Sequence, residues 1–430
     1  MRNNRLIAPC VLILVLWFAV VFSAVASEPD SSATQWGLGG HVKYQYVYTH
    51  VPQDSVFHSI SGDNLQDHNL EARLKISARR DSLDFEAHTQ FITVYSDRLS
   101  GFRDTPGLIF YGRDVINDDR RWFDLTHEFH NQGKKATLIR LDRLNVAYTG
   151  DKTVIRFGRQ AISWGNGLLF TPMDIFNPFD PAAVDKEYKT GDDMLYAQYL
   201  LENGNDIQLV GVVRRNPVTG EVDTDQGSLA VKYHGFWDSN EFDVLLAEHF
   251  GDALIGLGVS TGLGGAVLRG DMVLTDTGSG SVFSVVGGAS YSWVSAGHNF
   301  TGLLEYYFNG YGQKGGDYSV SSLAENPELL KRLARGELFN LGRHYLGVSV
   351  RVEATPLLNL TPNLFINLID PSALAQLTLS YDWKQDIQLL AALNIPIGPN
   401  GSEYGGIDAV EPGTYLSTGF SLFTQLAWYF

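Results

Sequence analysis

The feature that most constrains the fold is a repeated alternation of apolar and polar residues with a period of two. In residues 70–79, for example, one face carries Leu70, Ala72, Leu74, Ile76 and Ala78, and residues 42–49, 300–309 and 387–397 repeat the pattern. A β-strand sends successive side chains to opposite faces, so each segment has one apolar face and one mixed face. About eighteen such segments follow residue 27, most near the roughly 10 residues that a tilted strand needs to cross a bilayer. The pattern predicts an all-β protein.

The lengths of the gaps between these segments decide which all-β fold to expect, because a two-sheet sandwich would alternate as well. Very short turns fall at 80–82, 150–152, 202–206, 237–240, 295–297 and 384–386, and long gaps at 50–67, 96–136, 164–192, 216–227, 310–342 and 398–413. If the first strand runs outward, every long gap falls on the outer side. This sorting predicts a transmembrane antiparallel up-and-down β-barrel of about 18 strands (about 16–18), with short periplasmic turns and long extracellular loops.

Composition excludes two other classes of protein. Hydrophobic residues make up 44% of the chain but the mean hydropathy is only -0.08. A polytopic helical membrane protein would need several apolar runs of about 20 residues, and none follows residue 27. The 48 acidic residues against 32 Lys and Arg give a formal net charge of -16, which argues against nucleic-acid binding because that depends on clustered basic side chains.

The N-terminus has the pattern of an export signal. Arg2 and Arg5 precede an apolar run over 11–22, and Ala24 and Ala26 supply small residues at a signal-peptidase spacing. We therefore predict a cleaved signal peptide over 1–26 that directs export through the Sec pathway, a short periplasmic segment over 27–36, and a barrel over 37–430. An uncleaved anchor helix over 7–26 is the alternative. Cleavage would remove Cys10, the one cysteine, so the mature protein would contain no disulfide.

Aromatic residues near the ends of the predicted strands are candidates for the two interfacial girdles of a barrel. The set is Tyr95, Tyr148, Tyr199, Tyr291, Trp293, Tyr381, Trp383 and Trp428, and ordinary packing is the alternative for each of them. The last segment, 415–430, is amphipathic and ends in an aromatic residue. Trp428 and Phe430 therefore resemble the signal that the outer-membrane assembly machinery reads, and we expect that machinery and the lipid bilayer to be partners.

Charged residues on the mixed faces are expected to line a water-filled lumen, because a charge facing a dry core costs several kcal/mol unless it is paired. The pore-lining candidates are Glu71, Arg73, Lys75, Glu86, His88, Arg143, Arg156, Arg159, Glu305, Arg351 and Glu353. About eighteen strands leave a barrel too wide for side chains to fill, and charges at a constriction would then set selectivity. The alternative is that most of these are solvated or cross-strand-paired wall charges.

The most distinctive local sequence lies around the predicted strand that ends near residue 160. A Gly-Arg-Gln ending and a Trp-Gly pair are followed by MDIFNPFDP over 173–181, and glycines and prolines of this kind suit a loop that folds back into the barrel. The constriction-loop candidates are Trp164, Gly165, Asn177, Pro178 and Asp180. Together with Gly158, Arg159 and Gln160, these residues resemble an uncharacterised porin-like family of Gram-negative outer-membrane barrels, similar to alginate-export and phosphate-type porins. The resemblance is specific over about residues 143–193 and implies a channel or transporter without catalytic residues.

Other local patterns give weaker signals. The His127–His130 segment lacks one residue of the zinc-protease spacing, and Asp223–Gly227 resembles half of a calcium loop, so we predict no metal and no cofactor. Residues 319–335 form the one plausible helix, with Pro327 in a first turn. It falls in an outer loop, where we expect a surface element rather than a lid in the barrel mouth.

The sequence therefore predicts a porin-like channel in the cell outer membrane for diffusion or selective transport of an unknown small solute. One alternative is a barrel that anchors or sheathes a partner, such as an electron-transfer conduit or an efflux or lipid-transport component. An outer-membrane hydrolase is the least supported reading, because no G-x-S-x-G motif occurs. We do not expect an enzyme.

Overall fold

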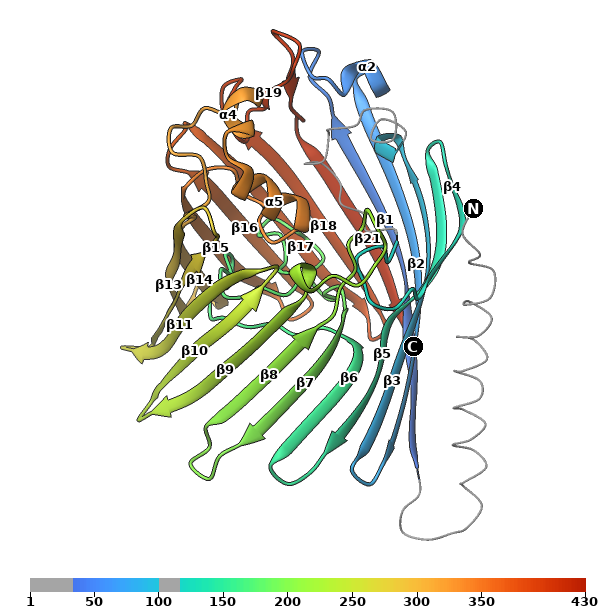
Figure 1. Cartoon of the computed structure of the whole chain (residues 1–430). Helices are drawn as coiled ribbons and strands as arrows, with labels where there is room; N and C mark the ends of the chain where they lie inside the picture. Colours follow the sequence, from blue (N-terminus) through green and yellow to red (C-terminus); the bar gives the residue numbers. More distant parts are fainter. Residues whose placement is uncertain (1–33, 100–116) are drawn as a thin grey trace.

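The protein is a single closed sheet with loops folded into and over its mouth (Figure 1). The computed structural model describes residues 34–99 and 117–430, so the predicted signal peptide lies outside the described residues. The strands are β1 (Gln35–His50), β2 (Asn64–Arg80), β3 (Leu83–Ser96), β4 (Thr126–Gln132), β5 (Lys135–Thr149), β6 (Thr153–Gln160), β7 (Asp192–Leu200), β8 (Asp206–Val212), β9 (Ser228–Trp237), β10 (Asn240–His249), β11 (Asp252–Leu263), β12 (Ala266–Asp276), β13 (Ser281–Ser295), β14 (His298–Phe308), β15 (His344–Thr355), β16 (Leu358–Asn367), β17 (Ser372–Lys384), β18 (Ile387–Ile397), β19 (Ile407–Asp408), β20 (Tyr415–Leu416) and β21 (Ser421–Tyr429). The helices that lie wholly within the described residues are α2 (His58–Ser61), α4 (Val320–Ala324) and α5 (Pro327–Arg335), and η1 (Thr224–Gln226) is a 3-10 turn.

Eighteen strands of the described residues form the barrel wall in chain order, with β3 paired to β5 and β18 to β21, and every pairing is antiparallel. The ends of the chain close it, because β21 pairs with β1 from His41↔Tyr429 to Thr49↔Ser421. Phe430 extends this pairing through backbone hydrogen bonds to Gly40. Strand β4 lies outside this circuit and pairs only with β5, while β19 and β20 form a small separate ribbon. The predicted fold class is confirmed.

The two ends of the barrel differ in their connections, as the gap lengths predict. The end that carries the first residues of β1 has only short turns, including Gly264–Gly265 between β11 and β12. Both glycines have positive φ angles, 58° and 86°, which a two-residue hairpin turn requires and which glycine adopts without steric cost. The long connections, including 51–63, 161–191, 213–227, 309–343 and 398–420, all lie at the opposite, outer end.

The outer face of the wall is apolar. On β2, Leu70 and Leu74 are 40% and 41% exposed, whereas Arg73 between them is only 3% exposed because it points inward. Aromatic side chains of the predicted girdles are exposed near the strand ends, among them Tyr95, Tyr148, Tyr199, Tyr291, Trp383 and Trp428. In the part of the chain that the structure describes, no helix is long and apolar enough to span a membrane.

The position of Leu74 gives a direct test of which face meets lipid. Leu74→Arg near the middle of β2 should destabilise the barrel by about 2–4 kcal/mol, the cost of an arginine at the bilayer midplane. Unfolding in urea from lipid vesicles would measure it. Thr301→Arg is the control, since Thr301 is exposed on the inward face of β14 and should tolerate the charge. An equal loss of stability in Leu74→Arg and Thr301→Arg would contradict the assignment of Leu74 to the lipid face and Thr301 to the inward face.

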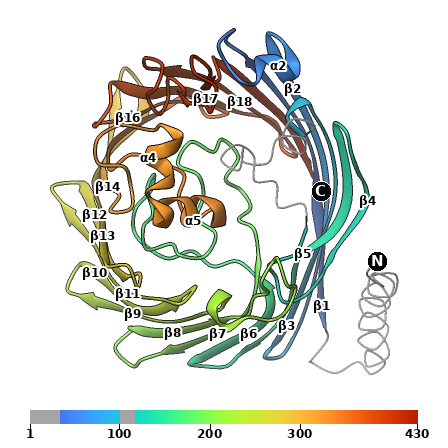
Figure 2. The same ribbon diagram turned by 45° about the horizontal axis from the view of Figure 1, so that its top comes forward.

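Three outer loops pack together into a cap over part of the mouth, and we call residues 51–63, 309–343 and 398–420 the cap. Its apolar core comprises Val51, Phe57, Tyr318, Leu323, Leu329, Ile407 and Leu416, which pack with Leu65 of β2. The predicted helix over 319–335 is two helices, because Asn326 caps a new helix that begins at Pro327. The expectation of a surface element is wrong: Leu329 of α5 is fully buried, and α4 and α5 lie over the lumen (Figure 2).

Candidate pore constriction

Residues 161–191, which we call the inner loop, leave the wall where β6 ends at Gln160 and run inside the barrel before β7 begins (Figure 2). The five constriction-loop candidates, Trp164, Gly165, Asn177, Pro178 and Asp180, all belong to it. Gly165 has a φ of 94°, and a Cβ atom there would lie 2.9 Å from a carboxylate oxygen of Asp271. A glycine is therefore required where the loop first meets the opposite wall.

Two wall carboxylates hold the backbone of the inner loop. Asp271 on β12 accepts hydrogen bonds from the backbone N–H groups of Asn166 and Gly167 at 2.7 and 3.1 Å. Glu305 on β14 accepts three more, from residues Leu168, Leu169 and Phe170 at 2.6, 2.8 and 3.1 Å. Hydrogen bonds to ionised acceptors are about twice as strong as neutral ones. Five consecutive amides are thus tied to β12 and β14.

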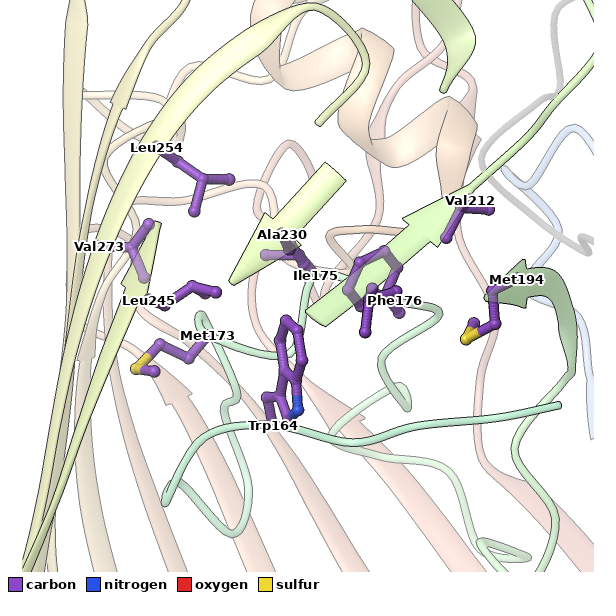
Figure 3. Close-up of a cluster of buried hydrophobic side chains, with 11 residues drawn as sticks. Trp164, Met173, Ile175, Phe176, Met194, Val212, Ala230, Leu245, Leu254 and Val273 are labelled. Atoms are coloured by element: carbon purple, nitrogen blue, oxygen red, sulfur yellow. The ribbon is translucent and has the colours of Figure 1, made fainter. Parts of the chain in front are cut away.

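An apolar cluster fixes the same loop against strands β7 to β12 (Figure 3). Its members are Trp164, Met173, Ile175 and Phe176 of the loop and Met194, Val210, Val212, Ala230, Leu245, Leu254 and Val273 of the wall. These wall residues point inward, so the lumen face is apolar on this side of the barrel. The sequence does indicate this apolar inner face, because residues 209–213 and 244–247 are continuous apolar runs, as expected of strands buried on both faces.

The returning half of the inner loop contacts the other side of the wall. Gln376 on β17 donates a hydrogen bond to the carbonyl of Ala182 at 2.8 Å. Lys43 on β1 lies 2.8 Å from Asp185 and 2.7 Å from Glu187. The Tyr188 ring lies 4.0 Å from the guanidinium carbon of Arg73 on β2. With its contacts to β8, β12 and β14, the loop follows most of the inner circumference and forms a ring within the barrel.

A buried ion pair joins the two halves of this ring. The Lys189 ammonium group lies 2.6 Å from the Asp174 carboxylate and also donates hydrogen bonds to Ile162 and Ser163. Burial raises the pKa of Asp174 to about 6, although Lys189 opposes the shift. Protonation of Asp174 as the pH falls through this value therefore weakens the ion pair that joins the two halves of the ring.

Most of the predicted pore-lining charges lie on inward faces, and many are already paired. Arg73 lies 2.8 Å from Asp142, which also contacts Arg143 at 2.9 Å. Glu71 contacts His41 and Arg73, Glu86 contacts His88 and Asn145, and Lys75 donates to the hydroxyl of Tyr188. Arg351 and Glu353 lie near the turn end of β15 and bond Asn359 and Asn299. The structure brings Glu71, Arg73, Lys75 and Arg143 close to the returning half of the inner loop.

A cavity of about 810 Å³ lies between the inner loop and the end of the barrel with the short turns. Its polar lining includes Glu86, Asn145, Arg156, Gln198 and Gln208. Among the described residues, the guanidinium group of Arg156 has no hydrogen-bond or ion-pair partner. Arg156 is thus a cation without an ion-pair partner on the wall of this cavity.

Arg159 is the one pore-lining candidate that the structure places elsewhere. Its side chain is 1% exposed and bonds Asp193 at 2.8 Å, Asp118 at 2.9 Å and the carbonyls of Leu141 and Phe123. Segment 118–125 covers the end of β6, and the ring of Phe123 packs edge-on against the outward-facing Phe157. Arg159 is therefore buried in the wall where the inner loop departs, and the prediction that it lines the pore is wrong.

The weaker motifs do not gather into a site. His127–His130 lies on the exposed strand β4, and Asp223 caps the short turn η1. Within residues 34–99 and 117–430, no group of three or more His, Cys, Asp or Glu side chains could hold a metal ion.

Comparison with solved structures identifies the fold. The chain is similar to OccAB4 of Acinetobacter baumannii, with a TM-score of 0.53, 9% identity, and coverage of 94% of this chain and 100% of that chain. A BenF-like porin from Pseudomonas fluorescens Pf-5 gives a TM-score of 0.50 at 9% identity, covering 92% and 98%. The chain has the fold of an outer-membrane porin. OccAB1 of A. baumannii agrees, with a TM-score of 0.51, 10% identity, and coverage of 91% and 96%. No protein-family model and no curated protein sequence matches, so the predicted resemblance to porins is confirmed at the level of the fold.

Proposed function

We propose that the protein is an outer-membrane channel for small solutes, in which the inner loop forms the constriction. The observation that carries this proposal is the ring itself, a loop that contacts the inner wall from β8 around to β1 and β2. A ring held at many points narrows a wide barrel to a fixed aperture, where side chains can discriminate between solutes. Leu168, at 50% exposure, is one loop side chain that stays accessible inside the barrel.

Two further features support a channel rather than an enzyme or a sheath. The 810 Å³ cavity on one side of the ring has polar walls suited to a hydrated solute. On the outer side, a second cavity of about 250 Å³ is lined by Arg120, Arg121, Arg214 and Arg335 beside Asp192 and Glu337. A sheathed partner would need the space that the inner loop occupies.

The test of this function is the current through the refolded barrel in a planar lipid bilayer. We expect discrete conductance steps and uptake of small solutes into vesicles. The control is protein diluted into buffer without detergent, because the barrel cannot close under that condition. A correctly refolded, heat-modifiable barrel that passes neither ions nor solutes would contradict the proposal.

The free cation in the cavity predicts a change in ion selectivity. Arg156→Glu should shift the reversal potential in a salt gradient toward cations, since it replaces an unpaired positive charge by a negative one beside the permeation path. Arg80→Glu is the matched control, because Arg80 lies at the β2–β3 turn outside the cavity. The same reversal potential in both variants and the wild type would remove Arg156 from the pathway.

A further inference from the structure

The first residue of β1 lies at the rim of the 810 Å³ cavity between the inner loop and the short-turn end of the barrel. Gln35 is part of the cavity lining, as is Arg156 of β6. Gln35 is separated by an even number of positions from His41 and Lys43, whose buried side chains point inward. Alternation along β1 therefore places the side chain of Gln35 on the lumen side of the wall. The chain that precedes Gln35 leaves the wall at this cavity.

Gln35 and Arg156 lie in one row of paired residues that crosses five neighbouring strands. The pairs are Gln35↔Arg79 between β1 and β2, Arg79↔Asp84 between β2 and β3, Asp84↔Ala147 between β3 and β5, and Ala147↔Arg156 between β5 and β6. Four strand spacings of about 4.8 Å place Arg156 about 19 Å along the wall from Gln35. The curvature of the wall makes the direct path through the cavity shorter than this.

The other charged side chains that line the cavity already have partners. Arg79 forms an ion pair with Asp84, and Glu86 lies 3.0 Å from the ring nitrogen of His88. Arg156 forms no ion pair or hydrogen bond through its guanidinium group with any residue that the structure describes. A carboxylate that enters the cavity therefore meets one guanidinium group that is not already bound to an acidic side chain.

The N-terminal tail, residues 27–33 of the predicted mature chain, has the charge and the length to reach this guanidinium group. Its sequence is SEPDSSA, with carboxylates at Glu28 and Asp30 and no Lys, Arg or His side chain. Extended chain spans about 16 Å from Asp30 to Gln35 and about 23 Å from Glu28 to Gln35. Pro29 restricts the residue before it to extended conformations, so Glu28 keeps its reach. Both carboxylates can therefore approach Arg156.

We propose that Arg156 binds the carboxylates of the N-terminal tail, so that the tail occupies the cavity and intermittently blocks the channel from the periplasmic side. Gln198 of β7 lies diagonally opposite Arg156 and adds a polar side chain to the same part of the cavity. Because the tail is tethered at the cavity rim, its effective concentration there is about millimolar, and a weak ion pair holds it for part of the time. The tail site rests on the predicted cleavage of the signal peptide, and on the proposed channel only for its effect on current.

Disulfide cross-linking in the mature barrel tests the tail site without requiring a current. Cleavage removes Cys10, the one cysteine, so Ser31→Cys with Gln198→Cys provides the only intramolecular disulfide. We expect rapid cross-linking under mild oxidation, at a rate that falls several-fold in high salt or when Arg156→Gln is added. Arg80→Gln is the matched control, because Arg80 lies at the β2–β3 turn outside the cavity, and it should leave the rate unchanged. Equal rates with Arg156→Gln and Arg80→Gln would overturn the tail site.

A second variant covers the case in which Arg156→Gln does not refold. Glu28→Gln with Asp30→Asn changes only the tail and leaves every residue of the barrel in place, and it should slow cross-linking by the same factor. A neutral tail that cross-links as fast as the wild-type tail would overturn the proposal. The intact mass of protein purified from membranes locates the N-terminus. An uncleaved chain, or a chain that starts beyond Asp30, would overturn the proposal as well.

Single-channel recordings separate the tail site from the channel. Deletion of residues 27–33 should lower the frequency of brief closures several-fold, and closures that survive the deletion would overturn the blocking role of the tail. Cross-linking that depends on Arg156 in a barrel without current would contradict the channel and leave the tail site standing. Current together with cross-linking that is independent of charge would contradict the tail site alone, and would leave Arg156 free to bind a soluble anion.

Discussion

Glu305→Ala should raise the single-channel conductance several-fold and weaken the discrimination between solutes. Its carboxylate holds three consecutive amides of the inner loop, and each hydrogen bond to a charged group contributes about 1.5–3 kcal/mol. Without them, residues 168–170 lose their attachment to β14, and the ring opens on that side. Conductance and liposome uptake of solutes of increasing size would measure the wider aperture.

Matched variants separate the loss of this anchor from the loss of a negative charge. Glu305→Gln keeps the shape of the side chain but has only one oxygen that can accept hydrogen bonds from the inner loop. The conductance of this variant should therefore fall between those of the wild type and Glu305→Ala. Glu353→Ala removes a more exposed inward carboxylate on β15 that does not touch the loop, and it should leave the size cut-off unchanged. If Glu305→Ala changed only ion selectivity and left the cut-off unaltered, the anchoring role would be wrong.

Arg159→Ala should cost about 3–5 kcal/mol of barrel stability, the usual effect of removing one partner from a buried ion pair. The side chains of Asp193 and Asp118 are almost fully buried, and both lose their cation in this variant. The carbonyls of Leu141 and Phe123 lose a donor as well. The urea midpoint of unfolding and the temperature of heat-modified gel migration should both fall.

The controls for this variant use one solvated arginine and one compensating change. Arg351→Ala removes an exposed arginine from an inward face and should change stability by no more than about 1 kcal/mol. Adding Asp193→Asn to Arg159→Ala should recover part of the loss, because it removes one of the two stranded charges. A loss below about 1 kcal/mol in Arg159→Ala would mean that the network does not hold the end of β6.

The wall of the barrel is predictable from the sequence because its two determinants are local. Alternation along each strand, as in Leu70 and Leu74, assigns the lipid face, and the lengths of the gaps assign the two ends. The inner loop is predictable in part. Gly165 and the Asn177–Pro178 pair indicate a loop that turns back, and that loop does lie inside the barrel.

The partners of the inner loop are not predictable, because each contact joins residues far apart in the chain. Glu305 and Asp271 look like ordinary lumen charges, and only the folded barrel places them beside amides more than a hundred residues away. The wrong prediction that Arg159 lines the pore has a different cause. Alternation along β6 places it on the face of the outward-pointing Phe157 rather than in the lumen, and segment 118–125 covers it there and supplies Asp118. The cap core likewise assembles from three separate loops, so α5 alone looks like a surface helix.

Modification of a single cysteine in the inner loop tests most directly whether the ring forms the constriction. In Leu168→Cys, a bulky water-soluble thiol reagent added during a single-channel recording should lower the current in discrete steps. Val410→Cys, which is highly exposed in the cap loop 398–420, should react without changing the current. A reacted Leu168→Cys channel that conducts like the unmodified one would contradict the account.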